Sequence, residues 1–543
     1  MPPASSPVGP RSWRTSALLV VTLSLIIGLS GSVSLPLEGH ESFVLQATRE
    51  MHARQDWIIP YFNGEPRLTK PPLNYWLTGL VAWLSHGLKE VQPWHARAVS
   101  ILSGVGLTVL ALVIGVRLYD RRVAIIGALI VATSAGYFTY VHDGRPDMLY
   151  AFWCTAAYAT FLHALTLPAP NWMRLWYALL IWCCIALATL TKGPHAPVMI
   201  LVACIVICRY RGLAWGDVAR ILQPVAGIIL LAALSIPWWW LVQQRLGGQG
   251  LHGTQLGGSL LTINPKKFLN LYYFYRPLQL VLPWWVLIPA AIALPFRKEE
   301  AAQSHRSLGI LIVVLALFFS FGPQQRWHYL LPVLVPMGLL MAAATVRGMD
   351  RGWLTRATSS IVAIHAAAIV AALLWTAREP EALSSAHRAA IFVAAISCAV
   401  LALLYYRLHR QDAVTFVATL AVMFALVYCN PGLAKFLWSQ DRHDHARLAT
   451  TVASAAGIST PIAMVGANPD IYTYYAARPI SMLASPTEVT RLLAESASRE
   501  LILIIPTADV ALIPAVITKE VLDYMPGDRD EATSILRLQL PST

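Results

Sequence analysis

The chain has 543 residues, of which 57% are hydrophobic and only 13% are charged. A soluble protein of this length could not bury so much apolar surface, so the composition excludes that class and favours a protein with many membrane spans. The formal net charge of +13 is not a nucleic-acid signature, because most Lys and Arg residues lie in short connections between apolar runs. The 7 cysteines all lie within apolar runs and no C-x-x-C occurs, which argues against disulfides and a cysteine metal site.

The first apolar run covers residues 17–35 and follows Arg11 and Arg14. It is long enough to cross a bilayer and has no obvious cleavage site, so we interpret it as a retained anchor rather than a signal peptide. The later apolar runs are 71–88, 97–117, 123–141, 147–167, 174–191, 194–208, 220–242, 278–296, 307–322, 328–346, 359–377, 388–406 and 413–433.

The basic connections decide which of these runs cross the membrane. If every run spans, nearly all arginine clusters fall outside the cell; if 71–88 does not span, they all fall inside, as the positive-inside rule requires. The 71–88 run begins with two prolines and contains Asn74, Ser85 and His86. We therefore predict a surface-lying or re-entrant helix there, about 13 transmembrane helices, an inside N-terminus and an outside C-terminus.

The C-terminal residues 434–543 change character. Segments 461–465, 478–482 and 501–506 have the pattern of strands, while 468–477 and 486–498 look helical, so we predict a small α/β domain. No G-x-G-x-x-G and no P-loop occurs, so no nucleotide site is visible. The predicted domains are a transmembrane domain of residues 1–433, with a first outer loop at 36–96, and this outer domain, whose simplest role is a packing or partner-binding cap.

The first outer loop opens with Glu38, His40 and Glu41, directly after the first apolar run. A carboxylate here could accept a proton from an attacking hydroxyl. Acids after an apolar run also commonly cap a helix, and both interpretations stay open.

Three cations lie on the predicted outer side, in distant parts of the chain. Lys70 precedes two prolines that stiffen the backbone, Lys192 lies in a Lys-Gly-Pro break between two apolar runs, and Arg326 is followed by aromatic residues. Each could be an interfacial anchor of the membrane. Their convergence on one face favours an anionic substrate such as a phosphate.

A further polar run, 142–148, lies between two spans on the same side. Asp147 begins the next predicted helix, where an acid suits the helix dipole. Because Arg145 lies close to Asp147 in the sequence, stabilisation of the helix is not the only role we consider for Asp147. His328 and Tyr329, which follow Arg326, add ring surfaces suited to a sugar.

The order of these motifs resembles the GT-C glycosyltransferases that use polyprenyl-phosphate sugars. The resemblance is closest to the bacterial 4-amino-4-deoxy-L-arabinose lipid A transferases, with protein O-mannosyltransferases as more distant relatives. It covers residues 16 to about 345. The matching positions are Ala47, Glu50-Met51, Asp56-Trp57, Pro60, Asn63-Gly64, Lys70-Pro71-Pro72-Leu73, Tyr75-Trp76-Leu77, Arg145-Pro146-Asp147-Met148, Thr191-Lys192-Gly193-Pro194, and Arg326 to Pro332.

The resemblance implies a polytopic α-helical GT-C fold and an inverting glycosyltransferase of the bacterial inner membrane. Its donor would be a sugar on a polyprenyl phosphate such as undecaprenyl phosphate, and its acceptor a lipid or glycan resembling lipid A, reached from the periplasm. The expected roles are catalysis by Glu41 or Glu38 with support from Asp147, donor-phosphate binding by Lys70, Lys192 and Arg326, and substrate binding by His40, Arg145, His328 and Tyr329.

The chain departs from the family pattern at three positions. His40 and Val44 stand where the family has Asp and Tyr, and Thr69 stands where an acid is implicated in metal binding in some members. No cofactor and no metal ligand is therefore predicted, although a divalent metal stays open. Two alternatives also stay open: a transporter or flippase of lipid-linked sugars, which predicts internal repeats and charges near span centres, and an inactive relative that binds lipid-linked sugar.

Overall fold

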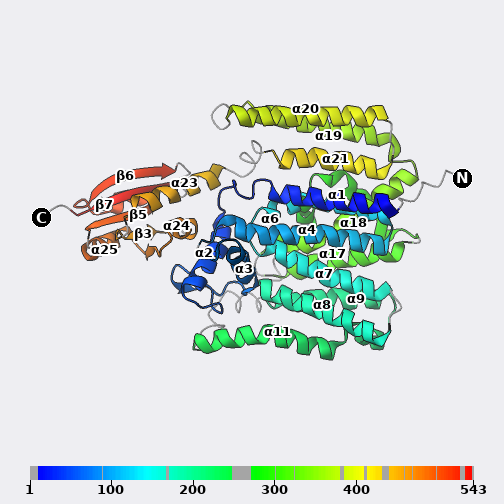
Figure 1. The fold of residues 1–543 in the computed structure, drawn as a ribbon, viewed down its shortest axis with the longest axis horizontal. Helices are drawn as coiled ribbons and strands as arrows, with labels where there is room; N and C mark the ends of the chain where they lie inside the picture. Colours follow the sequence, from blue (N-terminus) through cyan, green and yellow to red (C-terminus); the bar gives the residue numbers. More distant parts are fainter. Residues whose placement is uncertain are drawn as a thin grey trace. The chain divides into compact units, whose positions relative to one another are not determined.

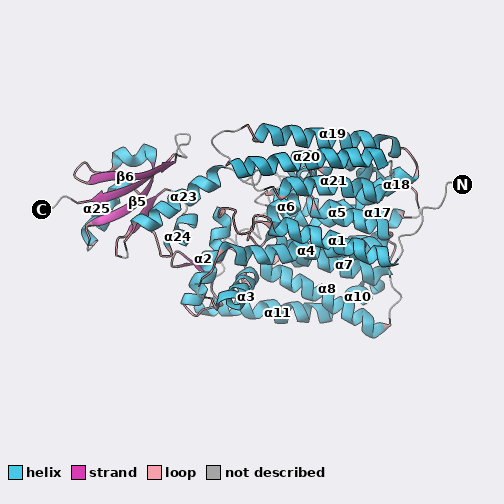
Figure 2. Ribbon diagram, turned by 45° about the horizontal axis from the view of Figure 1, so that its top comes forward, coloured by secondary structure: helices cyan, strands magenta, loops and turns pink. Residues whose placement is uncertain are grey.

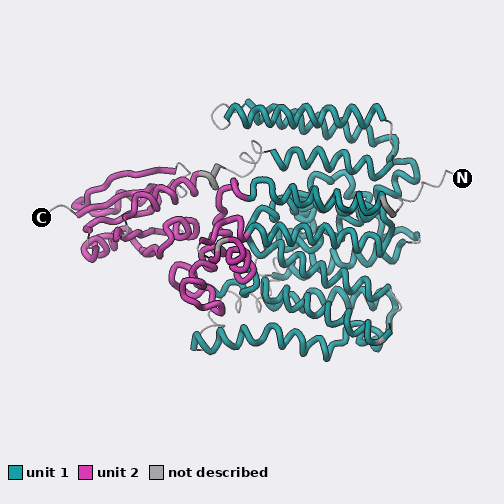
Figure 3. The backbone as a smooth tube through the Cα atoms, in the orientation of Figure 1, with its two compact units in different colours: residues 1–32, 68–74, 97–434 teal, residues 33–67, 75–96, 435–543 magenta. Residues whose placement is uncertain are grey.

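The structure is a computed structural model of the chain. It describes residues 10–88, 90–166, 170–247, 271–299, 301–322, 325–378, 384–408, 412–430, 440–457, 459–466, 469–496, 498–525 and 532–540. The chain divides into two compact units (Figure 3). Unit 1 comprises residues 1–32, 68–74 and 97–434, and unit 2 comprises residues 33–67, 75–96 and 435–543. Most of the 36–96 segment therefore shares a unit with the C-terminal residues.

Unit 1 is helical, and its long helices run side by side (Figure 1). Their order along the chain is α1 (Pro10–Leu29), α4 (Pro93–Leu118), α5 (Arg121–Ala132), α6 (Ala135–Val141), α7 (Asp147–Thr166), α8 (Asn171–Lys192), α9 (His195–Tyr210), α10 (Trp215–Leu222), α11 (Pro224–Arg245), α15 (Tyr272–Leu280), η1 (Trp284–Leu287), α16 (Ile288–Ala293), η2 (Leu294–Phe296), α17 (Ala302–Ser320), η3 (Trp327–Val333), α18 (Leu334–Asp350), α19 (Thr355–Thr376), α20 (Ser385–Leu408) and α21 (Ala413–Tyr428).

The protein is a multi-span membrane protein. Among the described residues, 9 helices are long and apolar enough to cross a membrane, and the pair α5–α6, bent by 55°, would make 10. Three shorter apolar helices, at His195–Tyr210, Trp284–Phe296 and Ala413–Tyr428, accompany them. Together these segments fall on the apolar runs that the sequence predicted to span.

The spanning helices differ in how much of their surface other helices cover. In the Trp327–Asp350 span 89% of the most apolar stretch is buried inside the structure, whereas in the Trp215–Arg245 span only 22% of that stretch is buried. The first therefore lies inside the bundle, and the second exposes most of its apolar surface, as a lipid-facing helix does. The helix α3 (Leu73–His86) has only 14 residues. It is neither among the helices long and apolar enough to cross a membrane nor among the three shorter apolar helices, and the absence of a span at 71–88 stays a prediction.

Unit 2 combines the helix α2 (Gly39–Ala53) and the small hairpin β1 (Tyr61–Phe62) and β2 (Glu65–Pro66) with a C-terminal α/β domain (Figure 2). The domain contains α23 (Gln440–Ala455), β3 (Ile462–Val465), α24 (Asp470–Ala476), β4 (Ser481–Leu483), η4 (Pro486–Glu488), α25 (Val489–Glu495), β5 (Glu500–Pro506), η5 (Thr507–Leu512), β6 (Thr518–Met525) and β7 (Thr533–Gln539). The predicted α/β fold class is confirmed.

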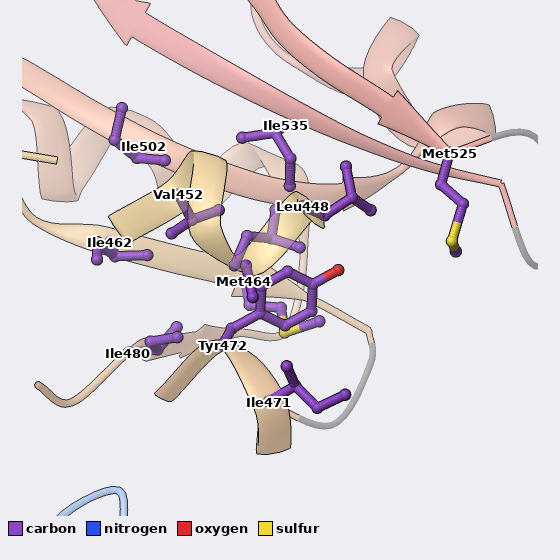
Figure 4. Close-up of a cluster of buried hydrophobic side chains, with 12 residues drawn as sticks. Leu448, Val452, Ile462, Met464, Ile471, Tyr472, Ile480, Ile502, Met525 and Ile535 are labelled. Atoms are coloured by element: carbon purple, nitrogen blue, oxygen red, sulfur yellow. The ribbon is translucent and has the colours of Figure 1, made fainter. Parts of the chain in front are cut away.

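The five-stranded sheet has the order β4-β3-β5-β7-β6, with β4, β3 and β5 parallel and β7 and β6 antiparallel to their neighbours. Side chains of β5 alternate between its two faces, as the period of a strand requires. Ile502 joins Leu448 and Val452 of α23 in one core (Figure 4). On the other face, Leu503 joins a second core that contains residues of α25.

Candidate functional site

The strongest charge cluster in unit 1 is centred on Asp147. Its Oδ1 accepts a hydrogen bond of 2.5 Å from Lys192 Nζ, and its Oδ2 lies 3.1 Å from Arg145 Nε. Asp143 Oδ2 lies 3.7 Å from Arg145 Nη1. The side chains of Asp147 and Lys192 are only 3% and 5% exposed. Buried charges of this kind are costly unless they are paired, and here two carboxylates balance two cations.

Helix ends create this cluster. The helix α7 begins at Asp147, where an acid meets the positive end of the helix dipole, and α8 ends at Lys192, where a cation meets the negative end. Gly193 has a φ of 123°, which favours glycine, and after Pro194 the chain begins α9 at His195. The predicted break at Lys192-Gly193-Pro194 is therefore present.

Aromatic rings surround the charges. Lys192 Nζ lies 4.7 Å from the ring centroid of Tyr329 and 5.3 Å from that of Tyr150. His328 Nε2 lies 3.3 Å from Arg145 Nη2 and 3.6 Å from Asp147 Oδ1, so this ring joins the two charged residues. The His328 ring in turn lies 5.5 Å from the ring of Tyr140. These rings lower access of water to the ion pairs.

The loop that carries Asp143 and Arg145 is fixed by two other segments. Ser100 Oγ of α4 donates to the Asp143 carbonyl at 2.7 Å, and Asn74 Nδ2 donates to the Gly144 carbonyl at 3.3 Å. Asn74 belongs to the segment 68–74 that also carries Lys70. The Lys70 segment and the Asp147 loop are thus joined directly.

Two of the three predicted phosphate ligands are not engaged by Asp147. Lys70 is half-buried and lies close enough to His195 and His328 for its charge to act on both rings. Arg326 is exposed, and its backbone is held by Tyr273 Oη, which accepts from its N–H at 2.9 Å and donates to its carbonyl at 3.1 Å. Lys70 and Arg326 therefore bring two further cations near the rings of His195, His328 and Tyr329.

Glu38, His40 and Glu41 lie together at the start of α2 in unit 2. The Glu38 carboxylate caps the helix by accepting from the backbone N–H groups of His40 and Glu41 at 2.8 and 3.2 Å, and Glu41 completes a capping box. The other Glu38 oxygen lies 3.2 Å from His40 Nδ1. Glu41 is fully buried, while His40 is exposed. The helix-cap interpretation thus describes Glu38 well.

The C-terminal domain holds the 36–96 segment within unit 2. Asn63 Nδ2 donates to the Ile480 carbonyl at 2.9 Å, and Asn63 Oδ1 accepts from the Ile480 N–H at 2.7 Å. Arg49 Nη1 donates to the Tyr474 carbonyl at 2.8 Å, and Tyr474 Oη donates to the Val91 carbonyl at 3.0 Å. Asn63, in the Asn63-Gly64 pair that matches the family pattern, therefore attaches this segment to the C-terminal domain.

Within the described part of the chain, no group of three or more His, Cys, Asp or Glu side chains is placed to hold a metal ion. Thr69 Oγ1 is buried and has no hydrogen-bond partner there.

The predicted site residues thus form two groups. Arg145, Asp147, Lys192, His328 and Tyr329 meet in unit 1, with Lys70 within electrostatic range of His328 and Arg326 within electrostatic range of Tyr329, whereas Glu38, His40 and Glu41 meet in unit 2. Sequence reasoning did not select Tyr140, Tyr150 and Asn74. Their signal was weak, because an aromatic or amide side chain beside a charged motif is common in any membrane protein.

The chain is similar to known glycosyltransferases. A family model described as dolichyl-phosphate-mannose-protein mannosyltransferase matches residues 37–247. A relative from Yersinia pestis (strain Pestoides F), named undecaprenyl phosphate-alpha-4-amino-4-deoxy-L-arabinose arabinosyl transferase, is 27% identical over 338 residues, which are 60% of this chain and 58% of the relative. The match thus spans less than two thirds of that relative's length.

Solved structures extend the similarity over nearly the whole chain. The crystal structure of ArnT from Cupriavidus metallidurans in the apo state has a TM-score of 0.75 at 19% identity and covers 96% of this chain and 98% of ArnT. The structure of the same protein bound to undecaprenyl phosphate has a TM-score of 0.74 at 19% identity, with 97% and 98% covered. The resemblance to the GT-C glycosyltransferases and the predicted fold class are confirmed.

Proposed function

We propose that this protein is an integral membrane glycosyltransferase that moves a sugar from a polyprenyl phosphate, such as undecaprenyl phosphate, to a lipid A-like lipid or a glycan. It would act at the periplasmic face of the bacterial inner membrane, with its N-terminus in the cytoplasm and its C-terminus in the periplasm. The observation that carries the proposal is the buried cluster of Asp147, Arg145 and Lys192, flanked by Lys70, in a unit with this fold.

Charge supports a phosphate as the group recognised. Lys70 and Arg326 add two cations to Arg145 and Lys192 on the side of unit 1 that carries Asp143 and Asp147. In the reaction an acceptor oxygen attacks the anomeric carbon, and the bond from that carbon to the phosphate oxygen breaks. The electron pair stays on the leaving polyprenyl phosphate, whose negative charge rises as the bond breaks. Lys70 and Arg326 therefore stabilise the transition state more than the bound donor, which is what catalysis requires.

Asp147 has a different task in this proposal. It holds Lys192 and Arg145 in fixed positions beside Tyr329 and His328, so that the cations are oriented before the donor binds. Preorganised charges avoid the cost of reorientation during the reaction. Lys192 reaches the phosphate if the donor draws it partly away from Asp147.

The acceptor proton needs a base if the acceptor is a hydroxyl. Glu41 is the first candidate, because it stands where the family keeps a Glu in its first outer loop; like Glu38, it also takes part in the capping box of α2. The base would take the hydroxyl proton as the new bond forms. If the acceptor is an ionised phosphate, no base is needed, and these acids serve recognition.

The location of the charges favours a transferase over a transporter. Asp147 begins α7, Lys192 ends α8, and Arg326 precedes η3. The spans that begin or end at or next to these residues have 20, 21 and 24 residues, long enough to cross the hydrocarbon core, so we place all three charges at a membrane surface, whereas a transporter is expected to bind its substrate near the middle of the bilayer.

Binding of undecaprenyl phosphate to the purified protein tests the proposal. Above Kd we expect the unfolding temperature to rise with the logarithm of ligand concentration, because a ligand at a hundredfold excess over Kd stabilises the folded protein by about 2.7 kcal/mol. Undecaprenol, which has the same chain without the phosphate, is the control and should have little effect. An equal shift with both ligands would contradict phosphate recognition.

A further inference from the structure

A charged cavity lies in unit 1, far from the Asp147 cluster. It has a volume of about 210 Å³ and is lined by Ala164, Leu165, Arg174, Leu213, Asp217, Arg220 and Ile221. Leu165 lies near the end of α7, which begins at Asp147, and Arg174 lies near the start of α8, which ends at Lys192. At 1.5 Å per residue, the 18 residues from Asp147 to Leu165 span about 27 Å, nearly a bilayer core. The cavity therefore belongs to the opposite end of the spanning helices.

The helix α10 covers this cavity and has the features of an interfacial helix. It packs on α7 and α8 through buried Val218 and Leu222, while Trp215 is 63% exposed. Gln223, with a φ of 43°, and Pro224 separate it from the lipid-facing helix α11. A short helix with one apolar face and one exposed polar face is typical of the membrane surface.

Exposed tryptophans place the cavity at the level of lipid headgroups. Trp172 and Trp176, in the first turns of α8, are 63% and 65% exposed. Arg209 lies over the ring of Trp215, with 5.2 Å between its guanidinium carbon and the ring centroid. Tryptophan concentrates where the hydrocarbon meets the polar headgroups, so these rings mark that boundary beside the cavity.

The charges in the cavity suit one anionic group. Arg220 Nη1 donates to Asp217 Oδ1 at 2.7 Å. Arg174 is half-buried, and no carboxylate among the described residues forms an ion pair with it. Two arginines and one aspartate leave a single positive charge, which matches a headgroup with a net charge of −1, as in phosphatidylglycerol, rather than the neutral headgroup of phosphatidylcholine. The planar guanidinium fork is well shaped for phosphate oxygens.

We propose that this cavity binds the headgroup phosphate of a monoanionic glycerophospholipid such as phosphatidylglycerol. Arg174 and Arg220 hold the phosphate, and Asp217 orients Arg220. The apolar side chains of Leu165 and Leu213 contact the first carbons of the acyl chains. The site is separate from the proposed donor site, and the lipid it holds is structural or regulatory rather than a reactant.

Native mass spectrometry of the purified full-length protein tests this site. The protein is incubated with phosphatidylglycerol, with phosphatidylcholine, or with inorganic phosphate alone. We expect one tightly retained phosphatidylglycerol in the wild type and at most weak retention of phosphatidylcholine. Arg174→Gln and Arg220→Gln should each lower retention about tenfold or more, since a charge-assisted contact is worth about 1.5–3 kcal/mol. Arg174→Lys keeps the charge without the fork and should lie between wild type and Arg174→Gln.

Arg356→Gln is the matched control, because Arg356 is an exposed arginine at the start of α19 that does not line the cavity. It should retain phosphatidylglycerol like the wild type. Equal retention of the two lipids by the wild type overturns the proposal, as does unchanged retention in the folded Arg174→Gln/Arg220→Gln double variant. Displacement of the lipid by millimolar inorganic phosphate would assign the cavity to a free anion and also overturn the lipid assignment.

Discussion

Lys192 donates a hydrogen bond of 2.5 Å to Asp147, and the two residues lie at opposite ends of consecutive helices. The carboxylate faces the positive end of one helix dipole and the ammonium the negative end of the next, so both dipoles stabilise the pair. Arg145 binds the other oxygen of the same carboxylate at 3.1 Å. Asp147 is therefore the residue on which the arrangement of the surrounding cations depends.

Asp147→Asn should lower both stability and transfer. Loss of one partner leaves buried cations uncompensated, which typically costs about 3–5 kcal/mol. The double variant Asp147→Asn/Lys192→Gln should be less destabilised than Asp147→Asn alone. Unfolding temperature and transfer rate measure the two effects. Asp350→Asn is the control, because its pair with Arg122 is exposed and such pairs contribute about 0–1 kcal/mol. Wild-type stability of Asp147→Asn would contradict the assigned role.

The proposed phosphate ligands can be tested singly. Lys70→Ala, Lys192→Ala and Arg326→Ala should each reduce transfer about tenfold to a hundredfold, because each removes a charge-assisted contact to the donor phosphate. Expression and unfolding temperature identify any variant that acts through folding. Arg378→Ala, an exposed arginine after α19, should behave as the wild type. Unchanged transfer in all three variants would remove the phosphate-binding proposal.

Amide variants test the two candidate bases, which both take part in the capping box of α2. Glu38→Gln weakens the cap of α2, which typically contributes about 1 kcal/mol, so we expect lower stability with partly retained transfer. Glu41→Gln should abolish transfer, because the amide keeps the shape but cannot accept the proton. His40→Asp should keep or raise transfer, because it restores the Asp that the family has at this position. If the Glu38/Glu41 double amide variant transfers at the wild-type rate, neither carboxylate is the base.

Unit 2 should show a pH-dependent stability that depends on Asp470. Burial raises the pKa of Asp470 above its ordinary 3.8, and the negative charge of Glu38 acts in the same direction. The folded protein then holds a proton that the unfolded chain has lost, so stability falls as pH rises through the folded-state pKa. Asp470→Asn should therefore melt higher than the wild type near pH 7. The difference should vanish below about pH 3, where the carboxyl is protonated in both states.

Asp523 provides the opposite control in the same domain. Burial alone would raise its pKa, but hydrogen bonds from Arg447 and Thr451 hold the pKa below 3.8. The contribution of Asp523 to the stability of the folded protein is present above the unfolded-state pKa, and it is lost as pH falls through the folded-state pKa. Asp523→Asn should therefore be less stable than the wild type near pH 7. A pH profile in which both asparagine variants shift in the same direction would contradict these assignments.

The sequence predicted the spanning segments and the Lys192 break because both depend on local patterns. Long apolar runs, basic connections and Lys-Gly-Pro act over a few residues. The contacts of Asp147 with His328 were not predictable in this way, since 181 residues separate them and the helix packing that brings them together leaves no local signature. The sequence did predict that Arg145 and His328 bind substrate, because both lie in motifs that match the family pattern.

The same limit applies to unit 2. The buried strands β3 and β5 were predicted from their apolar runs, whereas β6 and β7 were not. Most of β6 is exposed, and its Thr518–Met525 sequence mixes charges with apolar residues, so it lacks the pattern of a buried strand. The docking of Asn63 on Ile480 joins residues that are 417 positions apart. That contact explains why most of the 36–96 segment groups with the C-terminal residues.

Mass spectrometry of the envelope lipids and glycans is the most direct test of the proposed transferase. Wild-type cells are compared with cells that lack the protein, and with deletion cells that express wild type, Lys70→Ala or Asp147→Asn at equal levels. We expect a lipid or glycan to lose the mass of one sugar in the deletion, and wild type but neither variant to restore it. Identical spectra from wild-type and deletion cells, or full restoration by both variants, would contradict transfer through this site.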